Sequence, residues 1–158
     1  MDNRSEIYAR YKAAVAVRCA PEYRQRVEEV IRRRGLSSAM NDTRWLELQA
    51  AIRAVPETFR PAYVCRLLPD EAEHTPYFGE APTWVGAWEW FADDWEAAPP
   101  PFFSIEWMSI HPRQTIDRGK LIAPAIEDRS ELLVEILRKS RIPYEEIQPH
   151  TFLIRGYR

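Results

Sequence analysis

Hydrophobic positions in the first part of the chain recur at helical spacing. Between Ile7 and Val15 apolar residues return every three or four positions, with charged residues around them, which predicts an amphipathic helix. Pro21 is expected to end this helix and to open a second one, because proline suits the first helical position. Gly35, directly after three arginines, is typical of a helix end. The two segments therefore predict a small helical hairpin.

A third helix is expected after a serine-containing junction. Asp42 or Thr43 can cap its start, and Pro56 ends it. Its expected buried stripe consists of Trp45, Leu48, Ile52 and Val55.

Further along the chain apolar and polar positions alternate, which is typical of strands. This pattern predicts strands over residues 62–67, 83–91, 102–110, 144–147 and 152–157. Gly86, inside the second of them, marks a bulge or a close backbone approach. An irregular loop is expected from His111 to Pro124, and Asp128 with Glu131 predicts the capping box of a fourth helix.

The order of these elements predicts an α+β fold, with N-terminal helices followed by a mainly antiparallel sheet and one further helix packed on it. Residues 1–39 are interpreted as an N-terminal helical hairpin extension and residues 40–158 as the α+β domain, because the sequence from Met40 looks like a natural chain start. The residues expected to be largely buried are Trp45, Leu48, Ile52, Phe103, Ile105, Trp107, Leu133 and Ile136.

With 158 residues the chain is long enough for one full core. No apolar run approaches the ~20 residues needed to cross a bilayer, and the N-terminus has no signal-peptide core, so we expect a cytoplasmic protein. In that reducing compartment Cys19 and Cys65 are expected to be buried thiols.

Charge is unevenly distributed along the chain, although the formal net charge is only −2. No Lys or Arg occurs between Arg66 and Arg113, while this stretch holds nine acidic residues and five of the six tryptophans. Carboxylates without compensating cations repel one another and weaken a compact state. Such a block with aromatic residues beside it therefore favours a surface that meets a basic partner.

Trp95 is the best candidate for an exposed anchor in this stretch, since it lies outside the strand pattern and between two acidic residues. Trp84, Trp88 and Trp90 instead share one face of the predicted strand and are expected in the core. The predicted partner-binding residues are Glu89, Asp93, Asp94, Trp95 and Glu96.

Motifs for catalysis and cofactor binding are missing from the sequence. The five glycines form no phosphate-binding loop, the two cysteines cannot build a zinc site, and the three histidines lie far apart in predicted loops or turns. No catalytic, cofactor-binding or metal site is therefore predicted, and the acidic middle of the chain disfavours nucleic acid as a partner. Paired carboxylates such as Glu89 and Glu106 leave a small hydrolase as an alternative.

From Met40 onward, over roughly three quarters of the chain, the sequence resembles a family of small bacterial proteins of unassigned function. The resemblance lies in the start from Met40 to Leu48, in Trp88-Glu89-Trp90 and in Ile105-Glu106-Trp107. In general style the chain is also similar to the immunity proteins of bacterial polymorphic toxin systems. This resemblance implies a small, cytosolic, acidic α+β domain that caps a toxin's active site, and it supplies no catalytic residues.

We therefore expect an immunity or inhibitor protein that neutralises a bacterial toxin by inserting an acidic, Trp-bearing surface into a basic active-site cleft. The expected partner is the cognate toxin domain, with neither nucleic acid nor membrane involved. Two alternatives stay open, a small hydrolase that uses clustered carboxylates and a non-catalytic self-assembling module in which the N-terminal hairpin mediates dimers. The sequence sets neither the chemistry of the toxin nor an oligomeric state.

Overall fold

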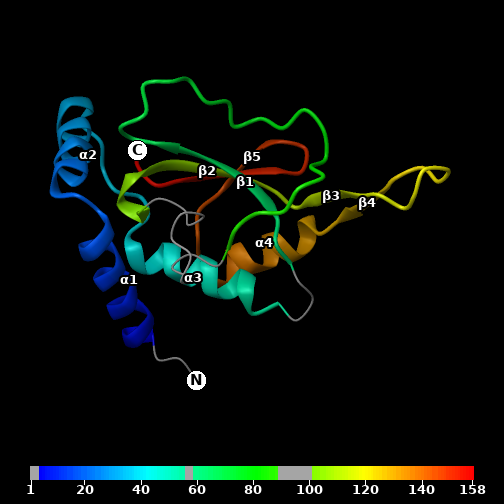
Figure 1. Cartoon of the computed structure of the whole chain (residues 1–158), viewed down its shortest axis with the longest axis horizontal. Coiled ribbons are helices and arrows are strands. Elements are labelled where there is room, and N and C mark those ends of the chain that lie inside the picture. Colours follow the sequence, from blue (N-terminus) through cyan, green and yellow to red (C-terminus); the bar gives the residue numbers. More distant parts are fainter. Residues whose placement is uncertain (1–3, 56–58, 89–100) are drawn as a thin grey trace.

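The computed structural model describes residues 4–55, 59–88 and 101–158 of the chain (Figure 1). Its helices are α1 (Arg4–Arg18), α2 (Pro21–Arg34), α3 (Asp42–Arg53) and α4 (Ser130–Lys139), with a short 3-10 helix, η2 (Phe102–Ser104). Its strands are β1 (Ala62–Leu67), β2 (Ile105–His111), β3 (Arg113–Ile116), β4 (Ala125–Asp128), β5 (Glu145–Gln148) and β6 (Thr151–Arg155). The predicted α+β fold, with N-terminal helices, an antiparallel sheet and a further helix packed near it, is confirmed.

Four strands form an antiparallel sheet in the order β1-β2-β6-β5, and β3 with β4 forms a separate two-stranded ribbon. Ser109 of β2 lies opposite Val64 of β1 and Leu153 of β6, which sets the register of the three strands. Successive side chains of a strand point to opposite faces of the sheet. Each strand therefore contributes to two different layers.

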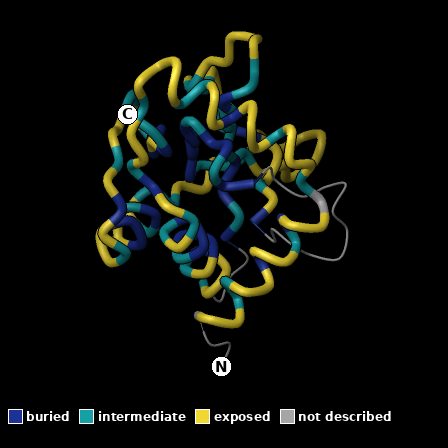
Figure 2. The backbone as a smooth tube through the Cα atoms, turned by 90° about the vertical axis from the view of Figure 1, so that its left-hand side faces the viewer, coloured by how far each residue is buried: buried dark blue, intermediate teal, exposed yellow. Residues whose placement is uncertain are grey.

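Helices α3 and α4 cover one face of this sheet (Figure 1). Met108 and Ile110 of β2 are fully buried and belong to the same apolar cluster as Leu48 of α3 and Leu133 of α4. Figure 2 shows such buried positions gathered in the middle of the molecule, with exposed positions around them. Burying one large aliphatic side chain stabilises the fold by about 1.5–3 kcal/mol. The predicted core residues are buried except for Phe103, which is half-buried beside the cluster.

The opposite face of the sheet is covered by the long loop that follows β1 (Figure 1). Trp107, Ser109 and His111 alternate with the helix-facing residues of β2, so they point toward this loop, and all three are buried. Trp107 is thus buried as predicted, but it lies outside the cluster between sheet and helices. An antiparallel sheet often leaves its second face in water, whereas here a loop occupies it.

The N-terminal helices pack on the same core. Helix α2 begins at Pro21 and ends before Gly35, whose left-handed backbone (φ 66°) closes it, as predicted. Tyr11 of α1 is 2% exposed and Val27 of α2 is 1% exposed. The backbone N–H of Phe102 donates to the Tyr11 hydroxyl at 3.2 Å, and the two rings stack with centroids 4.9 Å apart.

The junction between α2 and α3 is fixed by the last residues of the chain. Ser37 and Arg158 exchange two backbone hydrogen bonds of 2.8 and 2.9 Å. Helix α3 is capped by Asn41, whose Oδ1 accepts from the Arg44 N–H at 2.9 Å. The predicted cap at Asp42 or Thr43 is therefore wrong, because Asn41 has the extended backbone that capping requires and the helix already begins at Asp42.

The strand predicted over residues 83–91 is wrong for residues 83–88, which are irregular; the remaining three residues lie outside the described part of the chain. Trp88 is fully buried, whereas Trp84 is 46% exposed, so the two do not share a face. The reason is that the Trp88 side chain turns into the core and its Nε1–H donates to the Pro61 carbonyl at 2.8 Å.

Gly86 brings this irregular segment against the start of β1. Its N–H donates to the Arg60 carbonyl at 3.1 Å, and a Cβ atom at this position would collide with the Pro61 carbonyl oxygen. The close backbone approach predicted for Gly86 is confirmed.

Two further segments differ from the predictions. Residues 102–104 form η2 instead of a strand, because Phe102 turns inward to stack on Trp45, with ring centroids 6.2 Å apart. The predicted loop from His111 to Pro124 contains β3, which pairs with β4 in a ribbon that projects from the body of the molecule (Figure 1). Both strands are only four residues long, and neither alternates between apolar and polar residues, because β3 is mostly polar and the two apolar residues of β4 are adjacent.

Helix α4 begins at Ser130, with Arg129 as its N-cap residue. The Asp128 carboxylate accepts hydrogen bonds from the Ser130 N–H at 2.9 Å and from its hydroxyl at 2.6 Å. The predicted capping box of Asp128 with Glu131 is therefore wrong, because the N-cap residue is Arg129 and Asp128 bonds to Ser130 from the position before the cap.

Candidate partner-binding surface

The predicted partner-binding residues Glu89, Asp93, Asp94, Trp95 and Glu96 lie outside the described residues, as does Trp90. Their role stays a prediction. The described part of the same Lys/Arg-free stretch includes residues 69–88, called here the acidic loop. This loop forms the outer layer over the second face of the sheet (Figure 1).

The acidic loop is held mainly through its own backbone carbonyl groups. On the sheet side, the Ser109 hydroxyl donates to the Pro76 carbonyl at 2.5 Å, and Gln148 Nε2 donates to the Phe78 carbonyl at 2.8 Å. Further donors to loop carbonyls are Arg66 to Ala72, Thr115 to Ala81 and Pro82, Tyr63 to Ala87 and Gln49 to Trp88. Although it is irregular, the loop is therefore fixed along its length.

One acidic residue of the Lys/Arg-free stretch, Glu106, is paired with arginines from other parts of the chain. Glu106 accepts from Arg34 at 2.5 Å and from Arg66 at 2.8 Å, and its side chain is only 13% exposed. Burial alone raises the pKa of Glu106, but the hydrogen bonds and charges of the two arginines outweigh it and hold the pKa below its ordinary value. Glu106 therefore stays ionised and is unsuited to act as a general acid. Its suggested partner Glu89 lies outside the described residues.

Three carboxylates of the acidic loop face solvent instead. Glu71, Glu73 and Glu80 are exposed and form no ion pair with any residue that the structure describes. Asp70 is paired with His74 at 3.3 Å, in the same loop. The described part of the acidic stretch thus presents uncompensated negative charge on one layer of the molecule.

Large apolar side chains are also exposed in this region. The described residues include eight exposed large hydrophobic side chains, and all but Val17 belong to the acidic loop or to the β3–β4 ribbon with its tip, called here the arm (residues 113–128). They are Tyr77, Trp84, Val85, Ile116, Leu121, Ile122 and Ile126. The loop and the arm touch, because Thr115 of β3 bonds to Ala81 and Pro82. Because large exposed apolar patches are typical of interaction sites, this region is the candidate binding surface of the described residues.

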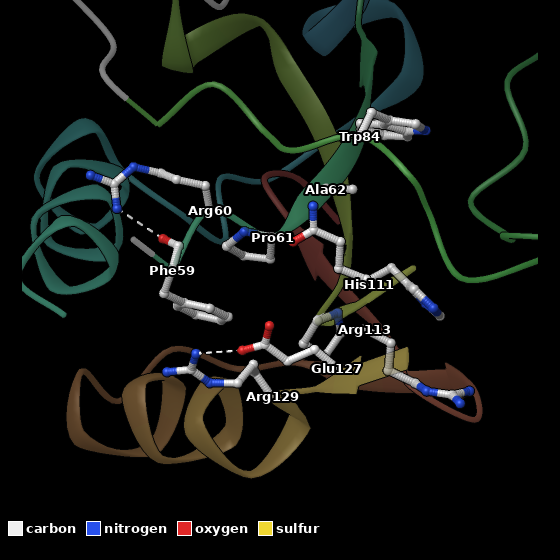
Figure 3. A pocket seen from close by; sticks show the side chains of 11 residues that line it. Phe59, Arg60, Pro61, Ala62, Trp84, His111, Arg113, Glu127 and Arg129 are labelled. Carbon is white, nitrogen blue, oxygen red and sulfur yellow. Dashed lines mark hydrogen bonds and ion pairs between the residues drawn. The ribbon is translucent and has the colours of Figure 1, made fainter. Parts of the chain in front are cut away.

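A polar hollow of about 180 Å³ lies where the loop, the arm and the start of β1 meet (Figure 3). Trp84, Arg60, Arg113, Glu127 and Arg129 are among its lining residues. Arg129 pairs with Glu127 at 2.9 Å, and its guanidinium lies over the Phe59 ring, 5.6 Å from the centroid.

His111, also in the wall of this hollow, is 4% exposed. Its Nδ1 lies 3.2 Å from the Thr151 hydroxyl, and its ring stacks on Phe78 of the acidic loop with centroids 5.0 Å apart. Burial lowers the pKa of His111, and the charge of Arg113 lowers it further. The neutral ring therefore supports the loop at neutral pH.

We predict an acid-sensitive loss of stability from this arrangement. The unfolded chain takes up a proton at His111 once the pH falls below the ordinary pKa of about 6.5, while the folded protein resists it. The free energy of unfolding should therefore decrease between about pH 7 and pH 5. His111→Gln should flatten this dependence, measured as melting temperature against pH. Equal slopes for His111→Gln and the unchanged protein would contradict the assignment.

Ser130, His150 and Asp128 lie close together and need comparison with a hydrolytic triad. The Ser130 hydroxyl lies 2.9 Å from His150 Nδ1, and Asp128 lies 3.5 Å from the same nitrogen. In a triad the serine and the carboxylate contact opposite ring nitrogens of the histidine. The cluster therefore caps α4 and lacks the arrangement that activates a nucleophile. Among the described residues no group of three His, Cys, Asp or Glu side chains could hold a metal ion.

The arm and the hollow were not anticipated from the sequence. One local signal for the arm is the turn-forming sequence Asp117-Arg118-Gly119. It is followed by the apolar residues Leu121 and Ile122, within a segment that was predicted to be a loop. The left-handed backbone of Gly119 (φ 111°) and the bond from its N–H to the Asp117 carboxylate at 2.9 Å build this turn.

The chain belongs to DUF6678, a family of unknown function, whose model matches residues 27–158. The match begins within α2 and includes the acidic loop, the arm and the hollow. Neither the comparison with curated proteins nor the comparison with solved structures found a match. None of the described helices is long and apolar enough to span a membrane.

Proposed function

We propose that this protein is a cytoplasmic immunity or inhibitor protein that neutralises a bacterial toxin by binding it through the acidic loop. The observation that carries the proposal is the joint exposure of unpaired carboxylates and large apolar side chains on one anchored layer. Trp84, Tyr77 and Val85 supply apolar anchors, and Glu71, Glu73 and Glu80 supply the charge.

The charge of this surface favours a basic partner. Negative potential steers a positively charged surface toward the loop and speeds association. Many antibacterial toxins act on nucleic acids or nucleotides and have basic clefts, which an acidic surface can enter in place of phosphate. The loop is fixed by its backbone hydrogen bonds, so little conformational entropy is lost when it docks. The segment that contains Trp95 continues directly from this loop along the chain.

The proposal predicts that a toxin domain is encoded beside this gene, and the test uses that domain as the partner. Reversing Glu71, Glu73 and Glu80 to lysine should slow association about tenfold and leave the melting temperature unchanged, because the three side chains are exposed. Trp84→Ala should mainly speed dissociation, by about tenfold, since an aromatic anchor acts on the lifetime of the complex. Association and dissociation rates, measured at low and at high salt, separate the two effects.

A matched control reverses Glu22, Glu28 and Glu29 on α2, which are also exposed and change the net charge by the same amount. This control should associate at nearly the normal rate and should protect bacteria that express the toxin domain. Asp93→Lys/Asp94→Lys/Trp95→Ala tests the predicted segment in the same assay. Full protection by both the loop variant and this segment variant would remove the acidic stretch from the interface.

A further inference from the structure

The tip of the arm (residues 117–122) holds two apolar side chains out in solvent. Leu121 is 100% exposed and Ile122 is 55% exposed. Figure 1 shows this tip at the far end of the arm, away from the sheet and the helices. Its shape is fixed locally, because the Arg118 guanidinium donates to the Ala123 carbonyl at 2.9 and 2.6 Å. The tip is therefore a preformed apolar projection, and covering it with a second surface is favourable.

The tip also carries positive charge. Arg118 and Lys120 are its two basic residues and Asp117 is its one acidic residue, so its formal charge is +1. Both basic side chains are exposed, and neither forms an ion pair with a residue in the described ranges. A tip of this kind is repelled by a basic surface and attracted by one that is both acidic and apolar.

The acidic loop of the same chain matches the tip in both respects. It holds four carboxylates and no Lys or Arg, and three of these carboxylates are the exposed, unpaired ones described above. Tyr77, Trp84 and Val85 of this loop are exposed apolar side chains, at 56%, 46% and 55%. Apolar contacts surrounded by opposite charges are typical of specific protein interfaces.

Leu121 makes no contact with the loop of its own chain, since it is fully exposed. Only the base of the arm touches that loop, where Thr115 bonds to the carbonyls of Ala81 and Pro82, and the rest of the arm points away from the body (Figure 1). Because each arm starts beside its own acidic loop, two chains related by a two-fold axis can each place their tip on the loop of the other.

We propose that this protein forms a dimer by reciprocal exchange of its arms, in which the basic, apolar tip of each chain docks on the acidic loop of a second copy. The contact removes Leu121 and Ile122 from water and brings Lys120 close to carboxylates of the second copy. The dimer forms from this chain alone, with or without a toxin. Because it covers the acidic loop, self-association competes with any other basic partner of that surface.

The first test is the molar mass of the full chain in solution, measured by analytical ultracentrifugation at several concentrations and at low and high salt. We expect a dimer that salt weakens, because screening reduces the attraction between the opposite charges. Leu121→Ser should weaken the dimer at least about tenfold, since the change occurs twice in a symmetric dimer, and should leave the melting temperature unchanged. Val17→Ser is the matched control, because Val17 is 82% exposed on α1, and it should dimerise normally.

The second test reverses the charge of each surface in turn. Lys120→Glu changes the formal charge of the tip from +1 to −1, and Glu71→Lys/Glu73→Lys/Glu80→Lys changes that of the loop from −4 to +2. Each variant alone should stay monomeric, because its tip and its loop then have charges of the same sign. An equimolar mixture of the two variants should form a heterodimer, since every tip then meets a loop of opposite sign.

Three results would overturn the proposal. They are an unchanged chain that stays monomeric up to about 1 mM, equal dimerisation of Leu121→Ser and Val17→Ser, and a mixture of the charge-reversed variants that forms no heterodimer. A monomer that binds anionic lipid vesicles and loses this binding in Leu121→Ser would assign the tip to a membrane surface instead. All of these measurements use this chain without a toxin, so their outcome is independent of the toxin experiment.

Discussion

Trp88→Ala should lower the free energy of unfolding by about 3–5 kcal/mol. The Trp88 side chain is fully buried, its indole lies edge-on to Tyr63 with ring centroids 4.9 Å apart, and its Nε1–H donates to Pro61. Truncation therefore leaves a cavity and an unsatisfied carbonyl at the start of β1. For a chain of this length each kcal/mol corresponds to about 2–4 °C, so the melting temperature should fall by roughly 6–20 °C.

Trp84→Ala is the matched control for this experiment. It removes the same side chain from the same loop, but from a position that is 46% exposed, so stability should change by less than about 1 kcal/mol. Thermal and denaturant unfolding of both variants gives the comparison. A similar loss in the two variants would show that Trp88 is not the residue that ties the loop to the core.

Glu106→Gln should lower the free energy of unfolding by about 2–3 kcal/mol, because a mostly buried carboxylate loses two charge-assisted hydrogen bonds. Arg34 comes from α2 and Arg66 from β1, so this one side chain links the N-terminal hairpin to the sheet. Arg34 is 41% exposed, and its share is reduced by solvent screening, whereas Arg66 is 25% exposed.

This contribution should also depend on pH. The folded pKa of Glu106 lies below its ordinary value of about 4.5, so its stabilisation is present above that pH and is lost as the pH falls through the folded pKa. The difference in melting temperature between the unchanged protein and Glu106→Gln should shrink accordingly in acid. Glu145→Gln, which affects a surface pair with Arg155 at 3.2 Å, should cost less than about 1 kcal/mol. Equal costs for the two substitutions would refute the special role of Glu106.

The sequence predicted correctly those helices and strands whose ends are marked by a proline or a glycine. Pro21 and Gly35 delimit α2, proline residues flank β1, and Pro143 precedes the final hairpin while Pro149 lies in its turn, so sequence alone placed these segments. The segment around Trp88 could not be placed in this way. Its tryptophan spacing is compatible with a strand, but the tertiary contact with Pro61 decides the outcome.

The candidate surface was predicted in part. Charge segregation is visible in the sequence, because no Lys or Arg occurs between Arg66 and Arg113. The sequence does not show which carboxylates are paired with a cation, since Arg34 and its partner Glu106 are separated by 72 residues. The hollow is still less accessible to sequence reasoning, because its walls come from the segment before β1, the acidic loop and the arm, which are separate in the sequence.

The way the acidic loop is anchored bears on how this protein can evolve. The sheet, arm and α3 hold the loop by donating to its main-chain carbonyls at residues 72, 76, 78, 81, 82, 87 and 88. Every amino acid carries such a carbonyl, so most outward-facing side chains of the loop can be exchanged without loss of its attachment. A scaffold with this property can follow a changing partner by substitution on its outer layer, while the donors beneath it, such as Ser109, Thr115 and Gln148, stay the same.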